Sequence, residues 1–173
     1  HAVETYVTNK RNPVSLAFSR EAWRLLEANF PRVLENPQDI GARGGMQLGA
    51  CFSGMAIENS MLGAAHALAN PLTAHYGITH GQAVGVMLPH VVRFNGEEVN
   101  DWYRELIEAS EPGSNSLSAV GGAFALADHI TELVGAAQLS TRLTELNVSE
   151  SILPELAAAA AKQWTGNFNP RRA

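Results

Sequence analysis

Residues 63–81 read Gly-Ala-Ala-His-Ala-Leu-Ala-Asn-Pro-Leu-Thr-Ala-His-Tyr-Gly-Ile-Thr-His-Gly. The stretch begins with alanine-rich sequence, which favours a helix, and then passes through Asn70-Pro71, which is a turn signal. Glycines are also frequent upstream, and they suit a helix that a neighbouring helix or a ligand approaches closely. We therefore predict a buried helix from about residue 40 to Asn70-Pro71, followed by a loop over residues 72–82.

Outward from this stretch, the chain is a succession of helical patterns separated by proline, glycine and asparagine. The short run Ala2–Val7 fits the tail of a helix. The other predicted helices are Ser15–Phe30, closed by Pro31; Ala83–Phe94, kinked at Pro89; Asp101–Ser110; Gly121–Gly135; and Ile152–Trp164, capped by Ser149 or Ser151. A polar connector is predicted at Glu111–Ser116, and no run alternates with period two over the length of a strand. The predicted fold class is therefore all-α, a helical bundle-like single domain over residues 1–173.

The composition limits the kinds of function that the chain can have. Its 173 residues are 46% hydrophobic and 17% charged, which suits one domain with a full hydrophobic core. The net charge of −5 disfavours binding to nucleic acids or anionic membranes. The stretch Met46–Ala69 carries Gln47 and Glu58, so we do not expect it to span a membrane. Cys51 is the only cysteine; we predict that it is buried and that the protein is cytoplasmic.

Histidines gather around the opening stretch. Four of the six lie between His66 and His90. On the predicted helix boundaries, His66 lies in the last turn of one helix and His80 at the junction of the loop with the next, where a folded-back loop could bring both to one metal ion. The same positions also fit a structural role, because the helix dipole stabilises a histidine near a helix C-terminus. Three of the remaining histidines are interpreted as surface or core residues: His75, His90 and His129.

Longer motifs around these histidines favour the metal. The segment Gly63-x-x-His66-Ala67-x-Ala69-x-Pro71-Leu72, followed by His80-Gly81-x-Ala83-x-x-x-Met87-Leu88-Pro89, resembles the signature of the iron-containing (group III) alcohol dehydrogenases. The opening His1-Ala2-Val3-Glu4-Thr5-Tyr6-Val7 and the closing Asn169-Pro170-Arg171 resemble further segments of that family. The resemblance covers nearly all of the chain and corresponds to the all-helical C-terminal half of a two-domain, dehydroquinate synthase-like dehydrogenase. It implies that the α/β nucleotide-binding domain is absent and that the chain is truncated at its N-terminus.

The resemblance also implies a metal site and a reaction. His1, His66 and His80 would be three of four metal ligands, and the fourth, an Asp, would stand four residues before His1. Fe²⁺ suits such a site, and Zn²⁺ is chemically acceptable. The implied reaction is hydride transfer between a small alcohol or its aldehyde or ketone and NAD or NADP, which the absent domain would mainly bind. The isolated chain is expected to be inactive, and the whole protein to form a homo-oligomer.

Two further residues are candidates for the site. Many members of that family have a second histidine one helical turn after the helix ligand, where this chain has Asn70. The resemblance places Asn70 beside the nicotinamide, as a catalytic and cofactor-binding residue, although an asparagine cannot relay a proton near neutral pH. Alternatively, Asn70 caps the helix before Pro71. Trp164 would line the substrate pocket, or else pack in the core.

Other functions fit parts of the sequence. A related enzyme of the same superfamily, similar to glycerol dehydrogenase or maleylacetate reductase, is one alternative. A non-catalytic helical module that binds a partner protein is another, because the chain has no Gly-rich phosphate-binding motif of its own.

Overall fold

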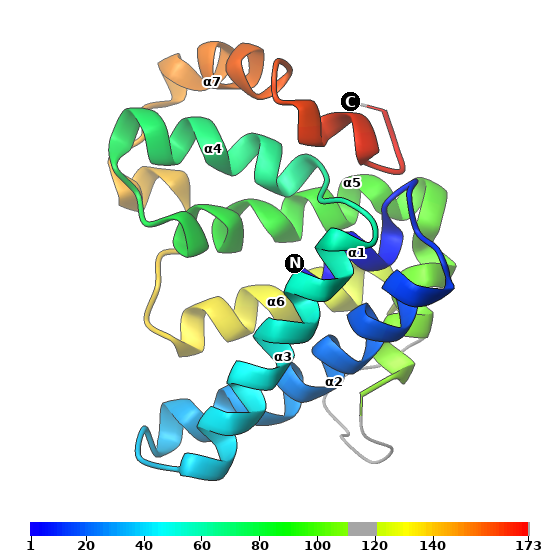
Figure 1. Cartoon of the computed structure of the whole chain (residues 1–173). Coiled ribbons are helices and arrows are strands. Elements are labelled where there is room, and N and C mark those ends of the chain that lie inside the picture. The colour runs from blue at the N-terminus through cyan, green and yellow to red at the C-terminus, as the bar shows by residue number, and fades with distance from the viewer. Residues whose placement is uncertain (111–120, 173) are drawn as a thin grey trace.

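A computed structural model describes residues 1–110 and 121–172 of the chain (Figure 1). This part contains helices and no strand, which confirms the prediction of an all-α fold. The α-helices are α1 (Ala2–Val7), α2 (Pro13–Glu35), α3 (Ile40–Glu58), α4 (Ala64–Tyr76), α5 (His80–Glu108), α6 (Ala123–Ala136) and α7 (Leu153–Ala160). Short 3₁₀ helices are η2 (Leu143–Leu146), η3 (Glu150–Ile152) and η4 (Trp164–Phe168). The predicted connector Glu111–Ser116 lies outside the described residues.

Helices α2 and α3 form a long antiparallel pair (Figure 1). The first begins with a capping box, because the Asn12 side chain accepts the N–H of Ser15 at 3.1 Å and the Ser15 hydroxyl is the acceptor for the N–H of Asn12 at 3.0 Å. Pro31 does not end this helix as predicted. It lies inside α2, and the helix continues until the N–H of Asn36 bonds to the carbonyl of Arg32.

The predicted single helix between residue 40 and Asn70 is in fact two helices. They are separated after Glu58, and the second begins after Gly63, whose backbone angles are not helical (φ −135°, ψ −145°). Asn70-Pro71 does not end α4, which continues to Tyr76 and stops at Gly77 in a left-handed conformation (φ 64°). The loop predicted over residues 72–82 is in fact limited to the few residues between α4 and α5. His66 lies in the first turn of α4 and not, as predicted, in the last turn of its helix.

Helix α5 joins two predicted helices into one. Pro89 lies within it as predicted, and a kink with non-helical angles lies ten residues later, at Val99 (φ −130°, ψ 29°), in the interval between the two predicted helices. The last predicted helix is also shorter than expected, since α7 ends at Ala160 and Trp164 belongs to η4. Cys51, which was predicted to be buried, is exposed on α3.

The shortest α-helix lies at the centre of the fold. All six residues of α1 are buried, and this helix packs against α2, α3 and α5. The main core gathers around it, with Tyr6, Trp23, Tyr103 and Leu126 among its largest side chains. Both α7 and η4 pack on α4, which places the end of the chain over the helix that carries His66 (Figure 1). Within residues 1–110 and 121–172, no helix combines the length and hydrophobicity needed to cross a membrane.

The joint between α5 and α6 depends on a glycine. Gly122 has φ 51°, and a Cβ there would lie 2.2 Å from Oδ1 of Asn100, the atom that accepts the N–H of Ala123 at 2.8 Å and caps α6. We expect Gly122→Ala to lower the free energy of unfolding by about 1–3 kcal/mol. Urea denaturation measures this, with Gly135→Ala as the control, because nothing lies within 4 Å of a Cβ at Gly135. Equal stability of the two variants would contradict the prediction.

Candidate metal centre

Three histidines from distant parts of the sequence meet at one place. His1 immediately precedes α1, His66 is the third residue of α4, and His80 is the first residue of α5. A ring nitrogen from each lies within 4.8 Å of those of the other two. The centroid of the His66 ring is 4.8 Å from that of His1 and 5.3 Å from that of His80. The predicted ligand set is therefore brought together by three helix N-termini.

The central ligand candidate, His66, is buried and held on one side only. Its Nδ1 is hydrogen-bonded to Oε2 of Glu4, whereas its buried Nε2 has no hydrogen-bond partner among the described residues. An unpartnered buried nitrogen costs free energy unless something binds it. A metal ion between the three imidazoles would satisfy this atom, so the residues present fit a divalent metal with nitrogen ligands.

Glu4 is a site residue to which the sequence analysis gave no role. Its side chain is only 4% exposed, and its Oε1 accepts the N–H of Ala65 at 2.8 Å and of Gly63 at 3.2 Å. Burial alone would raise the pKa of Glu4, but the hydrogen bond with His66, nearby positive charge and the N–H of Ala65 together outweigh it and hold that pKa below its usual value. The signal in the sequence was a lone charged residue in the apolar run Ala2–Val7, one helical turn after His1.

The other two histidines leave the site open on one side. His1 and His80 are both exposed, whereas His66 is buried beneath them. Partial desolvation of the imidazole and, to a smaller extent, the neighbouring His66 lower the pKa of His80, which favours the neutral imidazole that a metal requires. A small molecule could therefore reach a metal at this site from the exposed side.

The closing segment of the chain contributes a second support for α4. Oδ1 of Asn169 accepts the N–H of Ala64 at 3.3 Å, and the Asn169 amide pairs in both directions with the amide of Asn95, at 2.7 and 3.0 Å. Nη1 of Arg171 donates to the carbonyl oxygen of Phe94 at 2.8 Å. The Asn-Pro-Arg motif thus anchors the end of the chain to α5 and to the start of the helix that carries His66.

Asn70 and Trp164 lie outside the histidine cluster. Asn70 is one helical turn beyond His66 in the interior of α4, so it does not cap a helix; its Nδ2 donates to Oε1 of Gln163 at 3.0 Å. Trp164 is 60% exposed on η4, which excludes the alternative of core packing, and its ring stands edge-on to Phe168. Neither residue contacts a histidine through an interaction that the structure describes.

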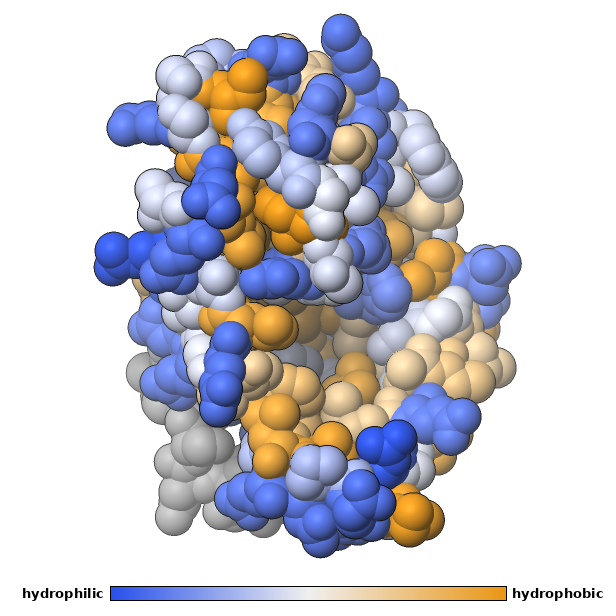
Figure 2. All heavy atoms as spheres, turned by 90° about the vertical axis from the view of Figure 1, so that its left-hand side faces the viewer, coloured by the Kyte–Doolittle hydropathy of each residue, from blue (hydrophilic) through white to orange (hydrophobic). Residues whose placement is uncertain are grey.

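An apolar cavity borders the site. It has a volume of about 320 Å³ and is lined by His1 and, beside His80, by Gly81 and Gln82; most of the remaining wall is apolar and includes Trp23 and Phe30. The face on which α5 begins and α6 ends is hollowed near its middle, with hydrophobic residues around the opening (Figure 2). Trp164 is not among the residues that line this cavity.

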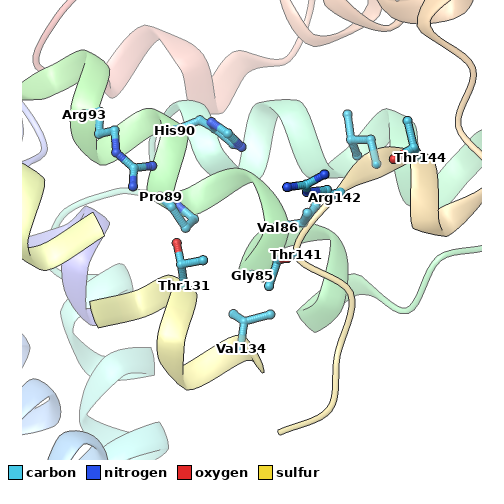
Figure 3. Close-up of a pocket in the computed structure, with 11 residues that line it drawn as sticks. Gly85, Val86, Pro89, His90, Arg93, Thr131, Val134, Thr141, Arg142 and Thr144 are labelled. Atoms are coloured by element: carbon cyan, nitrogen blue, oxygen red, sulfur yellow. The ribbon is translucent and has the colours of Figure 1, made fainter. Parts of the chain in front are cut away.

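A larger groove of about 620 Å³ is separate from the histidine cluster. Its polar residues come from α5, α6 and the segment that leads into η2, and include His90, Arg93, Thr131 and Arg142 (Figure 3). Arg93 is paired with Asp128 at 2.5 Å. None of the three clustered histidines lines this groove, so the larger volume does not mark the metal centre.

Comparison with known proteins finds a family and several relatives that match nearly the whole chain. A sequence model for the C-terminal part of the Fe-containing alcohol dehydrogenase family matches residues 1–173. The chain is 32% identical over 172 residues to 1,3-propanediol dehydrogenase of Klebsiella pneumoniae, covering 99% of this chain and 44% of that protein. It is 33% identical over 170 residues to alcohol dehydrogenase 4 of Schizosaccharomyces pombe, covering 98% of this chain and 39% of that protein.

The fold has a close counterpart among solved structures. The crystal structure of a 1,3-propanediol oxidoreductase superposes with a TM-score of 0.92 and 32% identity, covering 100% of this chain and 45% of that chain. The chain thus spans less than half the length of the relatives that it matches.

Proposed function

This chain belongs to the Fe-containing alcohol dehydrogenase family, and on that premise we propose that it is the metal-binding part of an NAD(P)-dependent alcohol dehydrogenase. The observation that carries the proposal is the buried Nε2 of His66, which has no hydrogen-bond partner in the described part of the chain and shares one cluster with His1 and His80. Nε2 of His129 is also buried without a hydrogen-bond partner among the described residues, so what distinguishes His66 is that its ring nitrogen lies within 4.8 Å of those of His1 and His80.

The proposed site would hold Fe²⁺ or Zn²⁺ through His1, His66 and His80. When bound, the metal supplies a Lewis acid that polarises the oxygen of the alcohol or carbonyl substrate. His66 gives the site a fixed ligand, because it is buried and its second nitrogen is bonded to Glu4. The exposed His1 and His80 flank the side from which a substrate would enter. The substrate would exchange a hydride with a nicotinamide cofactor. Another part of the whole protein would hold most of that cofactor.

Two residues are proposed to contact the organic molecules. Asn70 lies one turn after His66 on α4 and would hydrogen-bond near the nicotinamide, although its amide cannot exchange a proton as a histidine would. The exposed indole of Trp164 would form part of the substrate pocket once the rest of the protein is present. A small alcohol and its aldehyde or ketone are the proposed substrates, because the relatives are named 1,3-propanediol dehydrogenase and alcohol dehydrogenase 4. Residues 1–173 alone are expected to be inactive, and the cytoplasmic homo-oligomer remains a prediction from the sequence.

The metal content of the chain tests this proposal. After anaerobic loading with Fe²⁺ or with Zn²⁺ and removal of free metal, elemental analysis should find about one ion per chain for the three-histidine site. We expect His80→Ala to weaken binding by at least ~100-fold, since it removes a ligand. His75→Ala, at an exposed position outside the cluster, is the control and should retain the metal. A wild-type chain that binds no metal, or equal losses in both variants, would refute the proposed metal centre.

A further inference from the structure

A metal site of this kind depends on which nitrogen of His66 carries the proton, and the structure contains a group that decides it. Resting on the proposed function, we propose that Glu4 is a positioning residue, whose carboxylate fixes the tautomer and the orientation of His66 so that Nε2 is left free to bind a metal.

The chemistry of the two groups decides which of them carries the hydrogen. An ionised carboxylate only accepts hydrogen bonds, so the hydrogen between Oε2 of Glu4 and Nδ1 of His66 belongs to the histidine nitrogen. In a neutral imidazole with the hydrogen on Nδ1, the other nitrogen carries a lone pair. That nitrogen is the buried Nε2, which lies in the cluster with His1 and His80. A carboxylate behind a histidine ligand orients the ring and increases its basicity in metal sites generally.

The same carboxylate is itself held in place. Its Oε1 accepts the N–H groups of Gly63 and Ala65 at the start of α4, at 3.2 and 2.8 Å. Glu4 therefore joins α1, which follows His1, to the first turn of the helix that carries His66. A Cβ on Gly63 would come within 3.1 Å of Oε1, so glycine at this position leaves room for the carboxylate.

These contacts also allow a simpler role, in which Glu4 only caps the N-terminus of α4. The two roles can be separated by Glu4→Gln, which keeps the size of the side chain. Its amide oxygen should stay with the two backbone N–H donors, because turning the amide around would place donors against donors. Its NH₂ group then faces Nδ1 of His66 and donates to it, which moves the histidine hydrogen to Nε2 and blocks the lone pair.

The first measurement is the tautomer of His66 in the metal-free chain. Long-range ¹H–¹⁵N NMR spectra at alkaline pH distinguish a protonated from an unprotonated ring nitrogen, and His66→Ala identifies the signals. We expect the hydrogen on Nδ1 in the wild type and on Nε2 in Glu4→Gln. The control is Asn169→Ala, which removes the other side-chain contact at the start of α4 and should leave the tautomer as in the wild type. A wild-type His66 with its hydrogen on Nε2 would overturn the inference without any variant.

The second measurement is the dissociation constant of Zn²⁺. We expect Glu4→Gln to weaken binding by about 10–100-fold. An unchanged tautomer together with a Zn²⁺ affinity equal to that of the wild type would leave Glu4 as a helix cap only and overturn the inference. The two proposals fail separately: a wild-type chain that binds no Zn²⁺ refutes the metal centre, whereas the NMR result on the metal-free chain still decides whether Glu4 sets the tautomer.

Discussion

Replacing His66 with alanine is expected to abolish metal binding and to destabilise the metal-free chain by about 3 kcal/mol, because a buried carboxylate loses a hydrogen-bond donor. The second effect arises because Glu4 would keep its negative charge in a site that is only 4% exposed after losing the ring to which Oε2 is bonded. The two backbone N–H groups of Gly63 and Ala65 would then be its remaining partners.

A matched variant separates the loss of a ligand from the loss of stability. His80 is exposed, and its side chain has no hydrogen bond among those that the structure describes. His80→Ala should therefore lose the metal, while its free energy of unfolding without metal should stay within about 0.5 kcal/mol of the wild-type value. Urea denaturation in the presence of a chelator measures both variants. If His66→Ala were as stable as His80→Ala, the buried pair with Glu4 would contribute nothing to the fold.

The pH dependence of this stability has a definite sign. Because the pKa of Glu4 is lowered in the folded chain, its contribution to stability is complete above the ordinary pKa of a glutamate, about 4.3. The contribution is lost as the pH falls through the lower value of the folded state. The difference in the free energy of unfolding between the wild type and His66→Ala should therefore become smaller in acid.

The sequence predicted the helical fold class and the three histidines, but by different routes. Helical periodicity and the absence of alternating runs were enough for the fold class, since both are local properties. His1 and His66 are 65 positions apart, and no local rule places them together. Only the resemblance to a known family did so, and the structure confirms that the three rings meet.

Helix boundaries were predicted less well, for a physical reason. Asn70-Pro71 and Pro31 were interpreted as helix ends, yet both prolines lie inside helices. Proline removes one helical hydrogen bond, and the packing of α4 against α5, α7 and η4 supplies contacts that a rule based on local sequence does not include. The same error moved His66 from the first turn of its helix to the last.

The supporting residues of the site were missed because their partners are distant in sequence. Glu4 bonds to residues about 60 positions away, and Asn169 to a residue 74 positions away. Both residues belong to motifs that the sequence analysis quoted, but a motif does not reveal which buried groups its members satisfy. Their burial and hydrogen bonds in the structure give each a specific task.

Asn169→Ala is also expected to have a large effect and should lower the free energy of unfolding by about 3 kcal/mol. The reason is that each buried polar group left unpaired costs about 1–3 kcal/mol. The change removes both bonds of the reciprocal amide pair with Asn95 and the acceptor for the N–H of Ala64. The amide of Asn95 is almost fully buried, and the hydroxyl of Tyr103, at 3.2 Å, would be its one remaining described partner.

The neighbouring Asn167 provides the control for this prediction. It is exposed, and the bond that it makes to Nδ2 of Asn9 uses its backbone carbonyl, so Asn167→Ala should change the stability by less than about 0.5 kcal/mol. Denaturation in urea compares the two variants under the same conditions. Equal stability would mean that water replaces the Asn169 amide without cost, and that the closing segment does not hold the start of α4. A loss of stability in Asn169→Ala but not in Asn167→Ala would instead show that the end of the chain supports the helix that carries His66, through a contact that involves no metal ligand.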